Sequence, residues 1–277
     1  TGEHIAFVDG YHVFLAAARY SGKPLVLDAG KPAFPSAQLS SIGGEFLVWS
    51  ADGQSVSWST GPHFKTVSVQ GALAADFQPP SEGVNLSMTV SAEAPDAAIA
   101  LTNARIITMN DSRDVIENGT VLIQGNRIEL IGAAGSVSIP EGYQTINLEG
   151  KTLTPGFIDI HAHGPYGSGK IIPQQNWNLL AHLALGVTTV HNPSSQASLA
   201  FAAAEYQRVN KILGPRILST GEIVYGAKST NWGPLDNLDD ALAHDRRLKA
   251  KGAISVRNYN QPRRDQRQQV IEAAYRE

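Results

Sequence analysis

The chain has 277 residues, a formal net charge of −3 and no cysteine. The lack of cysteine excludes disulfides, thiolate metal sites and cysteine nucleophiles, and the lack of a basic surplus argues against nucleic acid as a partner. Hydrophobic residues make up 42% and charged residues 17%, which is the balance of a globular protein, and the length indicates more than one domain. The lack of a long apolar run predicts no membrane span.

Residues 1–75 are predicted to form short strands joined by tight turns. Apolar runs flank Asp9-Gly10, and a second pair of runs flanks residues 50–54, so each pair is expected to be a β-hairpin. Strand pairs with Asp-Gly turns and Trp-Ser endings favour blades of a β-propeller, although so few blades cannot close a ring. The alternative is a small independent β-domain.

Residues 76–98 are rich in Pro, Ser, Glu and Ala and are predicted to be a linker, with an extra strand within 84–90. The segment 99–153 then alternates strands and turns. Its strands are expected at 99–108, 119–124, 127–132 and 145–148, with a tight turn at Gly125-Asn126.

After Thr154 the pattern changes to alternating strands and helices, which is typical of parallel βαβ units. The expected strands are 156–161, 187–191, 216–219 and 253–256, and the expected helices are 176–185, 198–213, 238–251 and 264–277. Four βα units are half of a closed barrel, so we expect an internal piece of a longer protein. Its open sheet predicts poor stability unless the piece dimerises or the remainder is supplied.

The segment P-G-F-I-D-I-H-A-H-G at 155–164 places two histidines at the end of the first of these strands. Because alternate side chains of a strand share a face, His161 and His163 are expected to point the same way and to share a divalent metal. The apolar run 157–160 predicts a strand covered on both faces. An isolated H-x-H is more often a structural pair, but the flanking residues favour a metal site at the catalytic edge of a parallel barrel.

This context closely resembles the amidohydrolase superfamily, over roughly residues 100–277. The resemblance is carried by L-T-N-A-R-I-I-T at 101–108, G-N-R-I at 125–128, L-E-G-K-T-L-T-P-G-F-I-D at 148–159 and G-V-T-T-V at 186–190. It implies a small β-sandwich at 99–153 and, at 154–277, the first half of a TIM-type (β/α)8 metal-dependent hydrolase barrel. W-S-A-D-G-Q at 49–54 and Y-N-Q-P-R-R-D-Q-R-Q at 259–268 also resemble the branch in which a TolB-like β-propeller precedes the barrel. Residues 1–75 would then be the end of a propeller.

The resemblance implies that His161 and His163 bind one or two divalent ions, most often zinc. Further ligands and the catalytic base normally come from later strands, so the base is expected beyond Glu277 and the chain by itself is expected to be inactive. Many relatives bridge two metals with a carboxylated lysine after the fourth strand, where this sequence has Arg257. Because arginine stays protonated, a single metal or another bridging carboxylate is favoured. Arg257 is otherwise an ion-pair partner or a clamp for a substrate carboxylate.

Other residues near the expected catalytic edge are candidate pocket residues, with packing as the alternative. His191 ends the second strand, and Glu222 follows the third as a carboxylate ligand or, more commonly, a structural charge. Tyr225, Asn258 and Tyr259 are further pocket candidates.

The resemblance implies hydrolysis of a carbon–nitrogen bond, other than an ordinary peptide bond, in a small cyclic or linear amide or a dipeptide-like molecule. A non-catalytic, propeller-led binding protein with a degenerate barrel and a prolidase-like dipeptidase are the alternatives. The resemblance also favours a periplasmic or secreted location and allows a homo-oligomer.

Overall fold

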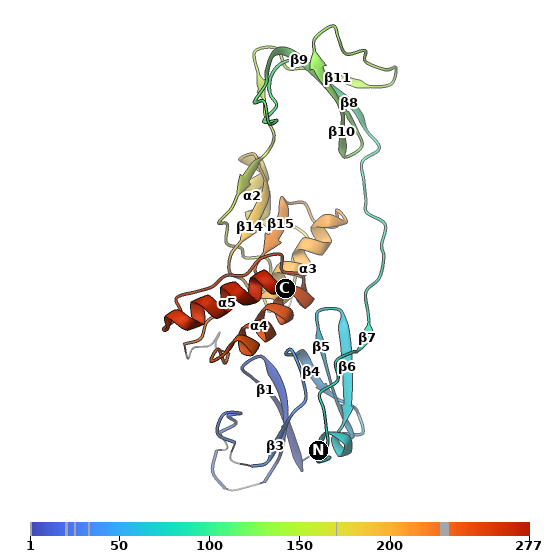
Figure 1. Ribbon diagram of the computed structural model, residues 1–277. Helices are drawn as coiled ribbons and strands as arrows, with labels where there is room; N and C mark the ends of the chain where they lie inside the picture. Colours follow the sequence, from blue (N-terminus) through green and yellow to red (C-terminus); the bar gives the residue numbers. More distant parts are fainter. Residues whose placement is uncertain (1, 20–21, 25, 33, 170, 228–232) are drawn as a thin grey trace.

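The computed structural model describes residues 2–19, 22–24, 26–32, 34–169, 171–227 and 233–277. An α/β region lies between an N-terminal β-region and an outlying β-sheet, and an extended segment runs beside it to connect the two (Figure 1). That segment contacts the α/β region through Glu93, whose backbone N–H donates to the carbonyl of Val209 at 3.1 Å. Within the described residues, no helix combines the length and apolar character needed to cross a membrane.

The N-terminal β-region contains two antiparallel sheets that share one core. One sheet has the order β1-β2-β3, and the other has the order β4-β5-β6-β7. Their bounds are β1 His4–Asp9, β2 His12–Ala17, β3 Ser36–Gln38, β4 Glu45–Trp49, β5 Ser55–Thr60, β6 His63–Ser68 and β7 Val84–Asn85, with the short helix α1 Val69–Ala72 after β6. Both predicted hairpins form, and side chains from the two sheets, Leu15 and Trp58 among them, are fully buried together. The extra strand expected within 84–90 is only the two residues of β7.

The outlying sheet contains the four strands predicted for 99–153 and one more. It is built from β8 Ala98–Ile107, β9 Val115–Gln124, β10 Arg127–Ala133, β11 Gln144–Asn147 and β12 Thr152–Leu153. The order is β10-β9-β8-β11, with β12 also paired to β8. Because β11 and β12 continue the edge of β8 in parallel instead of stacking on its face, the described strands form one mixed sheet without the second layer of a sandwich.

The α/β region has a three-stranded parallel sheet, β13-β14-β15, and no closed barrel among its described residues. Its elements are β13 Phe157–Asp159, α2 Trp177–Ala184, β14 Val187–Asn192, α3 Ala197–Arg208, β15 Arg216–Ser219, α4 Leu238–Lys251 and α5 Arg264–Arg276. Helix α4 has the predicted bounds because Asn237 and Asp240 form a capping box and Gly252, at φ 116°, ends it in the left-handed region.

Helix α3 ends at Arg208, although the sequence predicted a helix to Leu213. Asn210 adopts φ 60°, and the N–H of Lys211 bonds back to the carbonyl of Tyr206. Asparagine tolerates this left-handed conformation better than most residues, so it ends the helix despite the apolar pattern beyond it.

The strand predicted at 253–256 does not form. Chain pairing starts only at Arg257, whose carbonyl accepts the N–H of Val224, and Tyr259 donates back to the carbonyl of Val224. The result is an isolated parallel bridge between Val224 and Asn258. Because Val224 lies past the end of β15, this bridge does not extend the sheet as a fourth strand.

Strand β13 is shorter and far more exposed than the sequence predicted. It covers three residues, and Phe157, Ile158 and the following Ile160 are 62%, 66% and 75% exposed. The prediction of a strand covered on both faces is therefore wrong for this chain. Among the described residues, β13 is an edge strand paired with β14 alone, and its exposed side chains show that no packed layer covers its faces.

Candidate metal centre

The two histidines of the H-x-H motif lie together directly after β13. The ring centroids of His161 and His163 are 5.1 Å apart, and the rings meet edge to face at 75°. Both residues are exposed. Between them, Ala162 is buried and donates its N–H to the carbonyl of His191 at 3.1 Å, which fixes this turn of the backbone to the end of β14.

The ring of His163 is oriented by a backbone carbonyl. Its Nδ1 lies 3.4 Å from the carbonyl oxygen of Ser194, in the loop after β14. A proton on Nδ1 serves this contact and leaves the lone pair of Nε2 available, which is the arrangement that metal-binding histidines use. The donor chemistry of the pair therefore fits two imidazole ligands of zinc. Among the described residues, no group of three or more His, Asp or Glu side chains is placed to complete a site.

His191 lies at the same edge of the sheet, but its ring already contacts another side chain. Its Nε2 lies 2.9 Å from the hydroxyl oxygen of Ser255, in the segment after α4. This contact joins the end of β14 to the stretch in which the fourth strand was expected.

Glu222, the carboxylate after β15, is held by an ion-pair network. It accepts from Nη1 of Arg247 at 2.9 Å and lies 3.5 Å from Nζ of Lys251, which also contacts Glu45 at 2.7 Å. Its other oxygen accepts the N–H of Ala197 at the start of α3. Burial opposes ionisation of Glu222, but Lys251 and Arg247 outweigh it and hold the pKa of the carboxyl below its ordinary value. These contacts occupy both of its oxygens.

Arg257 and two tyrosines contact one another beside the bridge to Val224. The guanidinium carbon of Arg257 lies 4.8 Å from the ring centroid of Tyr259, within the range of a cation–π contact. Tyr225 meets Tyr259 edge to face, with 5.6 Å between centroids. The neighbouring Asn258 donates from its side chain to the carbonyl of Arg267 at 3.0 Å. The structure therefore brings Arg257 to Tyr259 and Tyr225 but joins none of the three to the histidine pair by a described contact.

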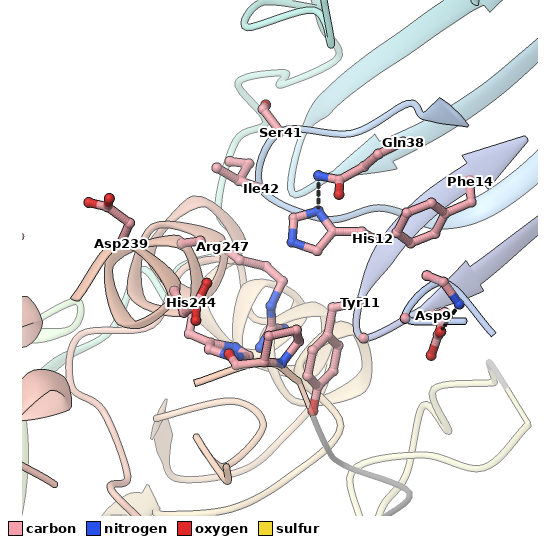
Figure 2. Close-up of a pocket in the computed structure, with 16 residues that line it drawn as sticks. Asp9, Tyr11, His12, Phe14, Gln38, Ser41, Ile42, Asp239, His244 and Arg247 are labelled. Atoms are coloured by element: carbon pink, nitrogen blue, oxygen red, sulfur yellow. Dashed lines mark hydrogen bonds between the residues drawn. The ribbon is translucent and has the colours of Figure 1, made fainter. Parts of the chain in front are cut away.

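Sequence reasoning missed the partners of Glu222 and the placement of His12 and His244. The latter two, which lack metal-like spacing, line one cavity between the N-terminal β-region and α4 (Figure 2). No local pattern signals either arrangement, because both depend on segments that are distant in the sequence.

The chain is similar to several known proteins, but no protein-family model matches it. It is 36% identical over 74 residues to an imidazolonepropionase of Roseobacter denitrificans; the match covers 25% of this chain and 18% of that protein. It is 30% identical over 84 residues to a 5-methylthioadenosine/S-adenosylhomocysteine deaminase of Clostridium tetani, covering 29% of this chain and 20% of that protein. The matches thus span at most about a fifth of these relatives' lengths.

A comparison with solved structures supports the fold. A prolidase candidate from Bifidobacterium longum matches with a TM-score of 0.53 and 22% sequence identity, over 65% of this chain and 47% of that one. At this identity the likeness concerns the fold alone.

Proposed function

We propose that this chain comes from a protein of the amidohydrolase superfamily. That protein would be a metal-dependent hydrolase that cleaves carbon–nitrogen bonds in small molecules. One observation carries the proposal: an exposed imidazole pair, His161 and His163, directly follows the first strand of a parallel sheet, with one ring oriented by a backbone carbonyl. The carboxyl ends of parallel strands are where such folds gather their catalytic groups.

When bound there, a divalent metal, with zinc as the first choice, supplies a Lewis acid that polarises the substrate carbonyl and lowers the pKa of water towards ~7. His161 and His163 would hold it through ring nitrogens. Arg257 at the place of a bridging lysine favours one ion over two, because a guanidinium does not form the carbamate that a neutral amine forms. The remaining ligands and the base are proposed to come from residues other than those that the structure describes.

The proposed substrates are small cyclic or linear amides. A prolidase-like dipeptidase is the second candidate, and Arg257 is the observation that favours it. No described carboxylate lies within ion-pair distance of Arg257, which stacks on Tyr259. A substrate carboxylate is a suitable bidentate partner for such a guanidinium.

We further propose that residues 1–75 are the end of a TolB-like β-propeller and that the protein is exported to the periplasm or beyond. Both proposals rest on the sequence resemblance, and the paired hairpins of β1–β2 and β4–β5 are compatible with blades. A propeller-led protein without catalysis remains the contrasting hypothesis, and metal content separates the two.

The proposal is tested by zinc binding. We expect the metal-free chain to bind zinc, and His163→Ala to weaken binding at least about tenfold because it removes one of two ligands. His63→Ala is the matched control, since His63 is an exposed histidine of β6 without a described side-chain hydrogen bond. Calorimetry and elemental analysis report the affinity and stoichiometry. Equal zinc binding by wild type and His163→Ala would refute the metal role.

A substrate test on the parent protein separates the two enzyme hypotheses. Metal-loaded protein is incubated with a cyclic amide and with an X-Pro dipeptide, and the released amine or amino acid is measured. Proline release alone would replace the amide proposal with the dipeptidase, and a parent protein that purifies without stoichiometric metal would favour the non-catalytic binding protein.

A further inference from the structure

The loops after the three parallel strands are joined by hydrogen bonds at the edge that carries the imidazole pair. His163 follows β13, Ser194 and Ser195 follow β14, and Gly221 follows β15. The N–H of Ser195 donates to the carbonyl of Gly221 at 2.9 Å, and the carbonyl oxygen of Ser194 lies 3.4 Å from Nδ1 of His163. The contact that orients His163 therefore belongs to a chain of contacts that runs through all three loops.

One peptide unit carries both of these contacts. The carbonyl of Ser194 and the N–H of Ser195 belong to the same trans peptide, in which the two groups point in opposite directions. Because the carbonyl of Gly221 accepts the N–H on one side, the carbonyl of Ser194 is directed to the other side, where the ring of His163 lies. The direction of the carbonyl that meets His163 thus depends on the turn after β15.

A buried asparagine fixes the same peptide from the end of β14. Asn192 is the last residue of that strand and is 0% exposed. Its Oδ1 accepts the N–H of Ser194 at 2.9 Å, and its backbone carbonyl accepts the N–H of Thr220 at 3.0 Å. The first contact closes a side-chain turn of the kind that asparagine favours, and the second ties that turn to the segment after β15. Asn192 therefore fixes the residue whose carbonyl contacts His163.

Gly221 has a conformation and surroundings that favour glycine. Its φ is 69°, and a Cβ atom there would lie 3.1 Å from both Cβ of Ala197 and Cδ2 of Leu248. The left-handed conformation is unfavourable for most residues with a side chain. A side chain at this position would therefore shift the carbonyl that holds the N–H of Ser195.

We propose that Asn192 and Gly221 are positioning residues for His163. His163 is exposed, so its ring is free to turn unless a contact orients it. By fixing the peptide between Ser194 and Ser195, the two residues keep the proton of the neutral imidazole on Nδ1 and leave the lone pair of Nε2 for a metal. The inference rests on the proposed metal role of His163, but the position of the ring proton is a property of the metal-free chain.

The position of the ring proton is measured by nitrogen NMR spectroscopy of the isotopically labelled, metal-free chain at about pH 8.5, where ordinary histidines are neutral. The signals lost in His163→Ala identify this ring. We expect the wild-type ring to carry its proton on Nδ1, and Asn192→Ala to give a mixture of the two forms. Asn85→Ala is the matched control, since Asn85 closes the same kind of turn to Ser87 in the extended connection. A wild-type ring protonated mainly on Nε2, or an unchanged ring in folded Asn192→Ala, would overturn the proposal.

Two further variants separate orientation from loss of packing. Asn192→Asp keeps an oxygen acceptor in the same place, so His163 should stay protonated on Nδ1; where this variant does not fold, Asn192→Ser supplies a shorter acceptor for the same turn. Gly221→Ala acts through the other contact and is expected to give the mixture of forms even if Asn192→Ala does not fold. Gly150→Ala is its control, since Gly150 has φ 74° but open space around it. An acceptor variant that behaves as Asn192→Ala does, or an unchanged ring in folded Gly221→Ala, would refute the positioning role.

Zinc affinity links the ring proton to the proposed metal site. We expect Asn192→Ala to weaken zinc binding about tenfold, the loss that removal of an outer partner of a metal-binding histidine usually causes. Equally tight zinc binding by the wild type and by folded Asn192→Ala with a mixed ring would refute this link. A wild type that binds no zinc but keeps the ring proton on Nδ1 would instead refute the metal site and support the positioning of His163.

Discussion

Glu222 illustrates how a carboxylate at the edge of a parallel sheet can serve the fold. It joins three segments: Arg247 and Lys251 of α4, the first turn of α3 through Ala197, and, by way of Lys251, Glu45 of the N-terminal β-region. Since the network contains two acidic and two basic groups, removal of one member leaves a buried charge uncompensated.

We therefore expect Glu222→Gln to lower the free energy of unfolding by about 3 kcal/mol at pH 7. The pKa of Glu222 is depressed in the folded state, so its contribution is present above its ordinary value of 4.5 and is lost as the pH falls through the folded value. Denaturant unfolding measures the change. Glu117→Gln, which breaks the exposed pair with Arg105, is the control and should cost less than about 1 kcal/mol. Equal costs for the two variants would contradict the buried network.

Asp245 is a second residue whose effect depends on pH. Its two carboxylate oxygens are buried and have no hydrogen-bond partner among the described residues, and burial raises its pKa from 3.8 to about 7. Because the folded state holds this proton more tightly than the unfolded chain, Asp245 costs stability as the pH rises from about 4 to 7.

Asp245→Asn is therefore expected to stabilise the chain at pH 8 by about 2 kcal/mol or more, and by less at pH 5. The comparison is made by denaturant unfolding at both pH values. Asp111→Asn, in the exposed turn after β8, should change neither. A gain at pH 5 equal to that at pH 8 would show that Asp245 is not protonated in the fold.

At the scale of elements, those with complete local signals were predicted well. Helix α4 carries its capping box and its terminal glycine in the sequence, and the β1–β2 hairpin carries its turn. Within the part of the chain that the structure describes, the segment 253–256 has the apolar residues of a strand but no continuous partner, and the apolar side chains of β13 are left exposed. Strand pairing and the burial of a strand's faces depend on distant segments of the chain. A local sequence pattern holds no information about those segments.

The contact between the β5–β6 turn and the end of α4 leads to a prediction about Gly61. This glycine has φ 55°, and a Cβ atom there would lie 2.0 Å from the carbonyl oxygen of Ala250. Gly142→Ala is a matched control, since Gly142 has φ 89° but open space around it. Both variants incur backbone strain, and we expect Gly61→Ala to cost about 1–3 kcal/mol more because the turn must also move away from α4. Thermal or denaturant unfolding measures the difference, and equal costs would mean that this contact does not form.

At the scale of the whole molecule, the exposed strand β13 has the largest consequence. Phe157, Ile158 and Ile160 are exposed apolar side chains in or directly after β13, which is an edge strand of the described sheet, and exposed apolar edge strands promote association. We expect concentration-dependent self-association of the chain in solution.

Ile158→Lys should raise the dissociation constant of this association at least about tenfold, because a charge opposes both burial and edge pairing. Sedimentation velocity over a range of concentrations measures it. Met88→Lys is the control, since Met88 is 80% exposed but lies in the extended connection between the β-regions. A chain that stays monomeric at every concentration, or that responds equally to the two changes, would rule out β13 as the contact.

Features that depend on neighbouring residues could be read from the sequence alone. The H-x-H spacing keeps His161 and His163 two residues apart, and turn and capping residues mark the hairpins and α4. The tertiary structure alone decided the features that need distant segments: the partners of Glu222, the exposure of β13, and the cavity between Tyr11 and Arg247. The physical reason is range, since turns and caps involve residues a few positions apart, whereas burial and charge pairing depend on which surfaces the folded chain brings together.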